Sequence, residues 1–162
     1  MRELGNTFIE DEMSDSIYKI IPKSPYTKVS QDKLNAAKSF IESAITCDSV
    51  DLVITDNLEF IDCGSNLVNI TCPKCGKEIG FDWWNEAMDI ACEDEFKKLD
   101  ITLPCCGEAS SLNDLRYDFK CGFACCSINV TNPKKLIDDD ETLIESIQKI
   151  LDCEINVIIA HY

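Results

Sequence analysis

Two short cysteine-rich segments constrain the fold of this chain more than any other feature. They are Cys72-Pro73-Lys74-Cys75-Gly76 and Leu103-Pro104-Cys105-Cys106-Gly107, and each directly follows a predicted strand. In a zinc knuckle, two thiolates separated by two residues bind one ion from a tight turn, which proline and glycine favour. The adjacent cysteines of the second segment can reach the same ion if the turn directs both side chains to one side. The pattern predicts a tetrahedral, structural Zn²⁺ site with no open coordination position, formed by Cys72, Cys75, Cys105 and Cys106.

Other arrangements of the cysteines are open at the level of sequence. A fallback site keeps Cys106 and replaces Cys105 with Cys121 or Cys63. Cys105 and Cys106 could instead form a vicinal disulfide, and the first pair could be ordinary buried thiols. If the site does bind zinc, we expect lysines in the first turn and backbone amides to offset the negative charge of the sulfurs.

The composition excludes several classes of partner. The chain has 15 lysines and arginines against 30 aspartates and glutamates, so its formal net charge is −15. Nucleic acids and anionic membranes both attract positive charge, so both are disfavoured as partners. The first residues contain no apolar stretch of signal-peptide length, and no window approaches the roughly 20 apolar residues of a membrane span. We therefore expect a cytoplasmic protein whose eleven cysteines are reduced, so that close pairs bind metal.

The N-terminal part of the chain reads as a tail followed by a strand, a helix and a second strand. Residues 1–15 are rich in acidic side chains and predict a flexible tail. A strand is predicted at 17–21. A helix follows, with Ser30 as its N-cap and apolar residues at helical spacing. Alternating apolar residues then predict a half-buried strand at 50–55.

The C-terminal part repeats the same order of elements. Alternation predicts a strand at 126–131, with Cys126 on its apolar face and Cys125 on the opposite face. A helix is expected to begin at Asp138, because Glu141 lies three residues later at the spacing of a capping box. A last strand is predicted at 155–160. Three further cysteines at helical or helix-end positions are expected to be packing residues, namely Cys47, Cys92 and Cys153.

These elements predict an α+β fold of two β-α-β units that share one sheet. The expected architecture is a split βαβ, ferredoxin-like sandwich formed by residues 16–57 and 123–162. Residues 58–122 are predicted to be a zinc-ribbon-like subdomain inserted between the two units. Such a short insertion has little interior of its own, so a structural metal would supply the missing stability. Within it we expect strands at 68–70 and 99–103 and a helix at 82–96.

The motifs of the chain resemble those of a family of small uncharacterised bacterial proteins with zinc-ribbon-like cysteines. The resemblance runs from about residue 20 to the end. It is carried by the segments 62–67, 72–76, 83–84, 104–107, 111–115, 122–124 and 160–162. The resemblance implies that Cys72, Cys75, Cys105 and Cys106 belong together. Where family members carry Trp-Pro-x before Gly-Phe-Ala, this chain has Phe119-Lys120-Cys121, which argues against Cys121 as a shared ligand.

Three functions are consistent with the sequence, and we rank them in this order. The first is a non-enzymatic protein-interaction module that contains structural zinc and binds a basic protein surface through its acidic side chains. The second is a thiol-dependent enzyme, in which cysteines outside the zinc site act with His161 in redox or acyl chemistry. The third is a nucleic-acid-binding zinc ribbon, for which the only basic pairs are 97–98 and 134–135.

Overall fold

A four-stranded antiparallel sheet forms the base of the molecule. The computed structural model describes residues 15–162, so the predicted tail at 1–15 lies, except for Asp15, outside the described residues. The sheet has the order β2-β7-β1-β8. Its strands are β1 (Ser16–Pro22), β2 (Ser49–Ile61), β7 (Gly122–Thr131) and β8 (Ile155–His161). The two central strands, β7 and β1, are therefore distant in sequence and pair in register from Ile17 opposite Thr131 to Ile20 opposite Ile128.

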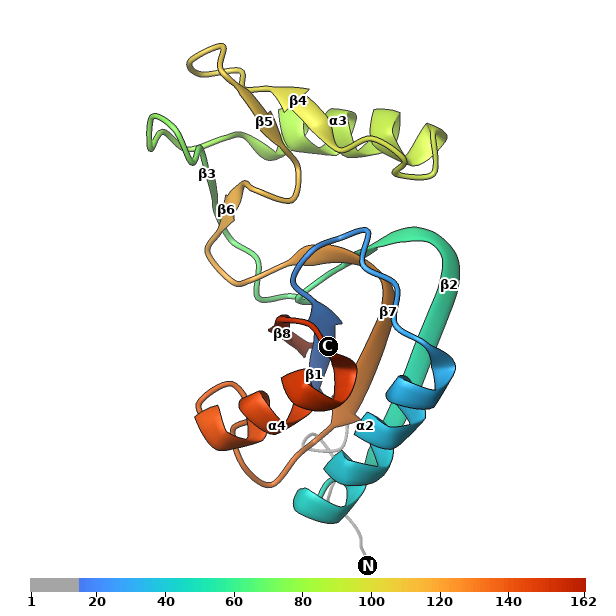
Figure 1. Ribbon diagram of the computed structural model, residues 1–162. Helices are drawn as coiled ribbons and strands as arrows, with labels where there is room; N and C mark the ends of the chain where they lie inside the picture. Colours follow the sequence, from blue (N-terminus) through green and yellow to red (C-terminus); the bar gives the residue numbers. More distant parts are fainter. Residues whose placement is uncertain (1–14) are drawn as a thin grey trace, which may run out of the picture.

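Helices α2 (Gln31–Ala44) and α4 (Glu141–Leu151) pack side by side on one face of this sheet (Figure 1). As predicted, Ser30 caps α2, and its side chain accepts a hydrogen bond from the amide of Lys33. The helix buries Leu34, Ala37 and Ile41, which follow the 3.6-residue period of one helical face. Together with residues of α4 and the sheet they form the helix-side core. The expected α+β class, with two β-α-β units in one sheet, is confirmed at this level.

The start of α4 differs from the prediction. The N-cap is Asp140, whose side chain accepts from the amide of Leu143, so a capping box from Asp138 to Glu141 is wrong. Three consecutive aspartates precede the helix, and each could cap it. Asp140 holds the position because Ile137 is fully buried and Lys135 pairs with the Asp140 carboxylate at 2.7 Å.

Strand β2 extends to Ile61, whereas the alternation of its residues predicted an end at Thr55. Its pairing with β7 shifts register between Ile54 and Glu59, as in a β-bulge, which changes the face that the side chains present. Before the shift Val50 is buried in the helix-side core, whereas Leu58, within the shifted segment, is buried on the opposite side of the sheet. The bulge therefore allows one long strand to contribute to two cores.

Residues 62–121 lie between β2 and β7 and form what we call the lobe, at the top of Figure 1. Its helix α3 (Phe81–Glu93) lies beside the hairpin of β4 (Asp100–Thr102) and β5 (Ala109–Ser111). A second two-stranded sheet pairs β3 (Ile70–Thr71) with β6 (Arg116–Tyr117). The predicted helix at 82–96 therefore ends earlier, because Glu95 and Phe96 adopt positive φ angles. The predicted strand at 68–70 begins only at Ile70.

The lobe packs on the sheet through a second hydrophobic cluster, the lobe core. Phe60 of β2 and Phe123 of β7 contact each other with ring centroids 5.2 Å apart. Phe60 also meets Trp84 of α3 edge-on at 5.6 Å, and Phe123 meets Phe96 at 5.4 Å. Cys125 belongs to this core while Cys126 belongs to the helix-side core, which confirms that they point to opposite faces.

The turn after β2, where the chain leaves the sheet, lies directly against the C-terminal strand β8. Gly64 has a φ of +65°, and a β-carbon there would collide with the carbonyl oxygen of His161. The amide of Ser65 donates to that same oxygen at 2.9 Å. Glycine is therefore required at position 64 both by the backbone angle and by the close approach of β8.

A polar contact fixes the same turn to the sheet. The buried Lys19 of β1 donates through Nζ to Asp62 Oδ1 at 3.1 Å and to Tyr162 Oη at 2.6 Å. The Tyr162 hydroxyl donates in turn to Asp62 Oδ2 at 2.9 Å. Burial acts to lower the pKa of Lys19, but its hydrogen bonds to Tyr162 and Asp62 raise it overall. Burial acts to raise the pKa of Asp62, but Lys19 and Tyr162 lower it below its usual 3.8.

Among the described residues, no helix combines the length and apolar character that crossing a membrane requires.

We predict that Asp62→Asn lowers the free energy of unfolding by about 1 kcal/mol at neutral pH. The cost is modest because the Asp62 side chain is 47% exposed and solvent screens the ion pair. The lowered pKa of Asp62 means that its carboxylate stabilises the fold above pH 3.8, and that this contribution disappears as the pH falls through the still lower folded-state value. Urea denaturation should therefore show a difference between the two proteins at pH 7 that fades as the pH falls below 3.8.

The matched control is Asp56→Asn, which removes a charge from an exposed position of β2, the strand that ends just before Asp62. It should change the stability by less than about 0.5 kcal/mol at either pH. An equal loss in the two variants would show that Lys19 draws no stability from Asp62.

Candidate metal centre

The first cysteine turn follows β3 and has the hydrogen bonds of a tight, closed loop. The amide of Cys72 donates to the carbonyl oxygen of Lys77 at 2.8 Å, and the amide of Gly76 donates to that of Cys72 at 3.1 Å. Gly76 has a φ of +80°, in the left-handed region that favours glycine. These bonds place Cys72 and Cys75 on one side of the turn.

The second turn, between β4 and β5, repeats this pattern with other residues. The amide of Leu103 donates to the carbonyl oxygen of Glu108 at 2.9 Å, and the amide of Gly107 donates to that of Leu103 at 2.9 Å. Gly107 has a φ of +73°. Leu103 therefore occupies the position that Cys72 has in the first turn, and it is buried in the lobe core. Leu103 has no thiol, so the second turn supplies its other sulfur from Cys105, two residues later.

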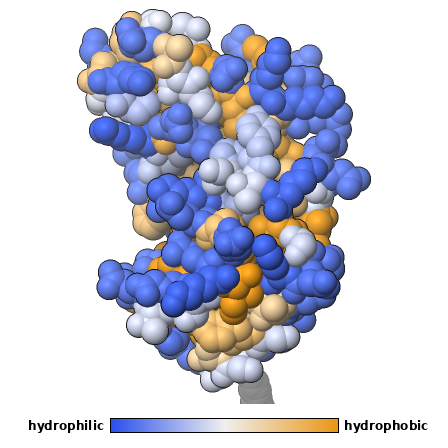
Figure 2. Space-filling view, viewed as in Figure 1, coloured by the Kyte–Doolittle hydropathy of each residue, from blue (hydrophilic) through white to orange (hydrophobic). Residues whose placement is uncertain are grey.

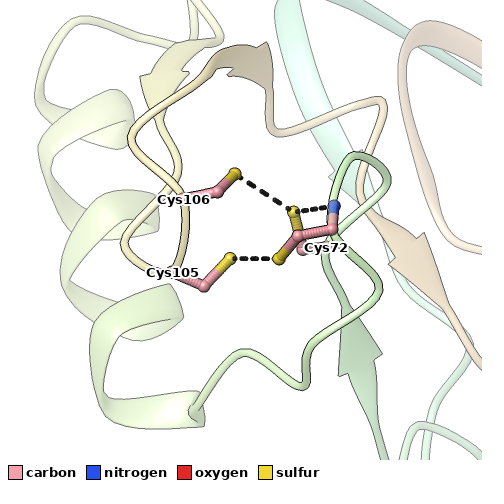
Figure 3. Close-up of side chains that lie close together, drawn as sticks. Cys72, Cys105 and Cys106 are labelled. Carbon is pink, nitrogen blue, oxygen red and sulfur yellow. Dashed lines mark hydrogen bonds between the residues drawn. The ribbon is translucent and has the colours of Figure 1, made fainter.

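The two turns bring four sulfur atoms together. The Sγ atoms of Cys72, Cys75, Cys105 and Cys106 all lie within 4.8 Å of one another. The Cys72 and Cys106 sulfurs are 3.8 Å apart, and those of Cys75 and Cys105 are 3.2 Å apart. Figure 3 shows Cys105 and Cys106 directed from one turn toward Cys72 on the other. Four sulfurs at about 2.3 Å from a tetrahedral ion would be about 3.8 Å apart, so the cluster fits a metal ion after small adjustments.

Backbone amides stabilise negative charge on the cluster. The amides of Lys74 and Cys75 both donate to the Cys72 sulfur at 3.3 Å. Burial acts to raise the pKa of Cys72, but these amides and the neighbouring thiols lower it to about 6. The contact with Cys75, together with burial, raises the pKa of Cys105 to about 12. A metal ion that binds here would displace the protons that remain on the other sulfurs.

The cluster lies at the edge of the lobe with protein on one side. Cys72 is buried and Cys105 is half-buried, while Cys75 and Cys106 are exposed. All four candidate ligands come from the protein, so a tetrahedral ion would have no position left for a substrate or water. The four cysteines could therefore form a closed metal site.

The cysteines of the fallback site are elsewhere. The Cys121 and Cys63 sulfurs are 3.3 Å apart in a buried position between the sheet and the lobe. Cys63 follows the end of β2, and Cys121 precedes the start of β7. Burial, followed by the contact with Cys63, raises the pKa of Cys121. This pairing was not predicted, because nothing in the sequence shows that the two strand ends are adjacent.

The structure also places the three cysteines that were predicted to pack and the single histidine. Cys47 and Cys153 pack against the helix-side core, as expected. Cys92 is exposed on α3, so its assignment as a packing residue is wrong. The side chain of His161 is exposed, and its Nδ1 lies 3.0 Å from the Ser16 hydroxyl. Within residues 15–162, its side chain makes no hydrogen bond to a cysteine.

Comparisons of this chain with known protein families, with curated proteins and with solved structures find no match.

We predict that Cys105→Ser weakens metal binding by more than about tenfold, because a serine hydroxyl is a much poorer ligand than a thiolate. Cys121→Ser is the matched control, since it removes a cysteine that the fallback site would need. Metal content, measured by elemental analysis after equal dialysis, should fall in the first variant and stay at the wild-type level in the second. The reverse result would assign the fourth ligand to Cys121.

Proposed function

We propose that the chain is a non-enzymatic protein-interaction module with a structural zinc site. The observation that carries the proposal is the closed group of four sulfurs supplied by two equivalent turns. Zinc suits this donor set because many small domains bind it tetrahedrally through four cysteines. The ligands are Cys72, Cys75, Cys105 and Cys106.

The proposal includes a finer description of the fold. The sheet order β2-β7-β1-β8 with both helices on one face supports a split βαβ, ferredoxin-like sandwich. The two knuckle-like turns support a zinc-ribbon-like subdomain, which we place at residues 58–122 between the halves at 16–57 and 123–162. Membership of the bacterial family that the motifs resemble is part of the same proposal.

The small interior of the lobe supports a structural role for the ion. Its strands contain only two or three residues each, and α3 buries only Ala91. Elements this short gain little from their own hydrogen bonds or apolar burial. One ion bound to both turns would connect β3 to the β4–β5 hairpin and so restrict the whole lobe.

The acidic surface supports the interaction part of the proposal. The formal charge of −15 exceeds what solubility requires of a chain of this size. Hydrophilic side chains cover much of the face in Figure 2. Hydrophobic patches lie between them, both on the lobe and on the part below it that contains the sheet, α2 and α4. A partner with a basic surface would complement this charge and associate quickly at low salt.

Affinity capture tests the interaction. We predict that the immobilised, metal-loaded chain retains proteins rich in lysine and arginine from a cell extract. Because the attraction is electrostatic, a rise from about 50 to about 300 mM salt should release them. A column of equally acidic but unrelated protein is the control. Recovery of no protein beyond that control would contradict the proposal.

A further inference from the structure

A groove opens on the lobe between α3 and strand β4. Its volume is about 410 Å³, which is in the range of sites that bind small molecules or peptide side chains. Its apolar lining comes from Trp83, Ala87 and Ile90 of α3, from Ile101 of β4 and from Leu112. Trp83, Ala87 and Ile90 recur at the spacing of one helical face, so α3 presents a continuous wall to the groove.

Part of this wall is apolar surface that the chain leaves open to solvent. Helices α2 and α4 each bury three residues, whereas α3 buries only Ala91. The Ile90 side chain is 62% exposed, and Trp83 is half-buried. Trp83 and Ala87 also contact the lobe core, so Ile90 is the most exposed apolar side chain of this wall, and a partner that covers it would add stability.

The groove is also a centre of negative charge. Residues 81–102 contain seven acidic and two basic side chains. Glu86, Asp94 and Asp100 line the groove, with Lys98 as the one basic lining residue. The last turn of α3 has no basic residue, although the C-terminal end of a helix carries partial negative charge. Acidic groups at that end repel the helix dipole, and a bound cation would relieve this repulsion.

We propose that this groove binds a basic, amphipathic segment of a partner protein. One large aliphatic or aromatic side chain of the segment lies against Trp83, Ile90 and Ile101, and flanking lysines or arginines pair with the acidic groups at the rim. The inference rests on the proposed function and states where the acidic module makes its contact. A second copy of this chain is a poor occupant, because two chains at −15 repel each other.

The probe is a synthetic amphipathic peptide of leucine and lysine, about 14 residues long, which forms about four helical turns. Two peptides serve as controls: one with the same composition in a scrambled, non-amphipathic order, and one with glutamate in place of lysine. Binding to the metal-loaded protein is followed by calorimetry and by tryptophan fluorescence. Both tryptophans of the chain, Trp83 and Trp84, lie in α3, so their emission reports on this helix.

Three protein variants locate the binding site. Ile90→Ala should weaken binding of the leucine–lysine peptide by about tenfold, because it removes the apolar contact. Glu86→Gln combined with Asp94→Asn should weaken it by about fivefold and reduce its salt dependence. The matched control is Glu42→Gln with Glu145→Gln, which removes two charges from exposed positions of α2 and α4 and should leave the affinity unchanged. All the substituted side chains are exposed, so the variants should fold.

The possible failures are distinguishable. If the groove pair and the control pair weaken binding equally, or if the scrambled peptide binds as well, the groove is not the site, although an acidic interaction module remains supported. If no lysine-containing peptide binds at low salt, both the groove and the proposed function are wrong. A dimer that dissociates on Ile90→Ala would assign the groove to a second copy of the chain and overturn the proposal.

Discussion

The connection of two distant turns by four sulfurs is the constraint on which the rest of the lobe depends. The turns lie about thirty residues apart in sequence, and their backbone hydrogen bonds are equivalent. Between them the chain forms α3 and β4, which bury little by themselves. An ion held by both turns would therefore close a loop and restrict the position of α3 relative to β4. The groove lies between these same two elements.

The lobe is attached to a sheet whose stability has other sources. The helix-side core is built from α2, α4 and one face of the sheet, and it contains no residue of the lobe. The lobe contacts the other face of the sheet, where Phe60 and Phe123 meet Trp84 and Phe96. Lys19 and Asp62 fix the turn by which the chain enters the lobe. This arrangement separates the sheet and its two helices from a lobe that an ion bound to the four cysteines would hold together.

Local signals in the sequence predicted much of this structure, and long-range contacts account for most of what they missed. Ser30 caps α2 as predicted, because a single good cap precedes an apolar helical pattern. At α4 three aspartates compete, and packing rather than propensity selects Asp140. The four cysteines could be grouped because proline and glycine mark both turns. The equivalence of the two turns was not visible, because the second turn has Leu103 at the position where the first has Cys72. Lys19 and its partner Tyr162 are 143 positions apart, so no local pattern could pair them.

Hydrogen exchange before and after removal of the metal tests the central claim most directly. Stripping the purified protein with a chelator under reducing conditions should remove the protection of backbone amides at residues 70–117, because the two turns are no longer held together. The amides of β1, β7 and α4 should keep their protection, since the helix-side core contains no residue of the lobe. Unchanged protection of the lobe in protein shown to be free of transition metal would contradict the account.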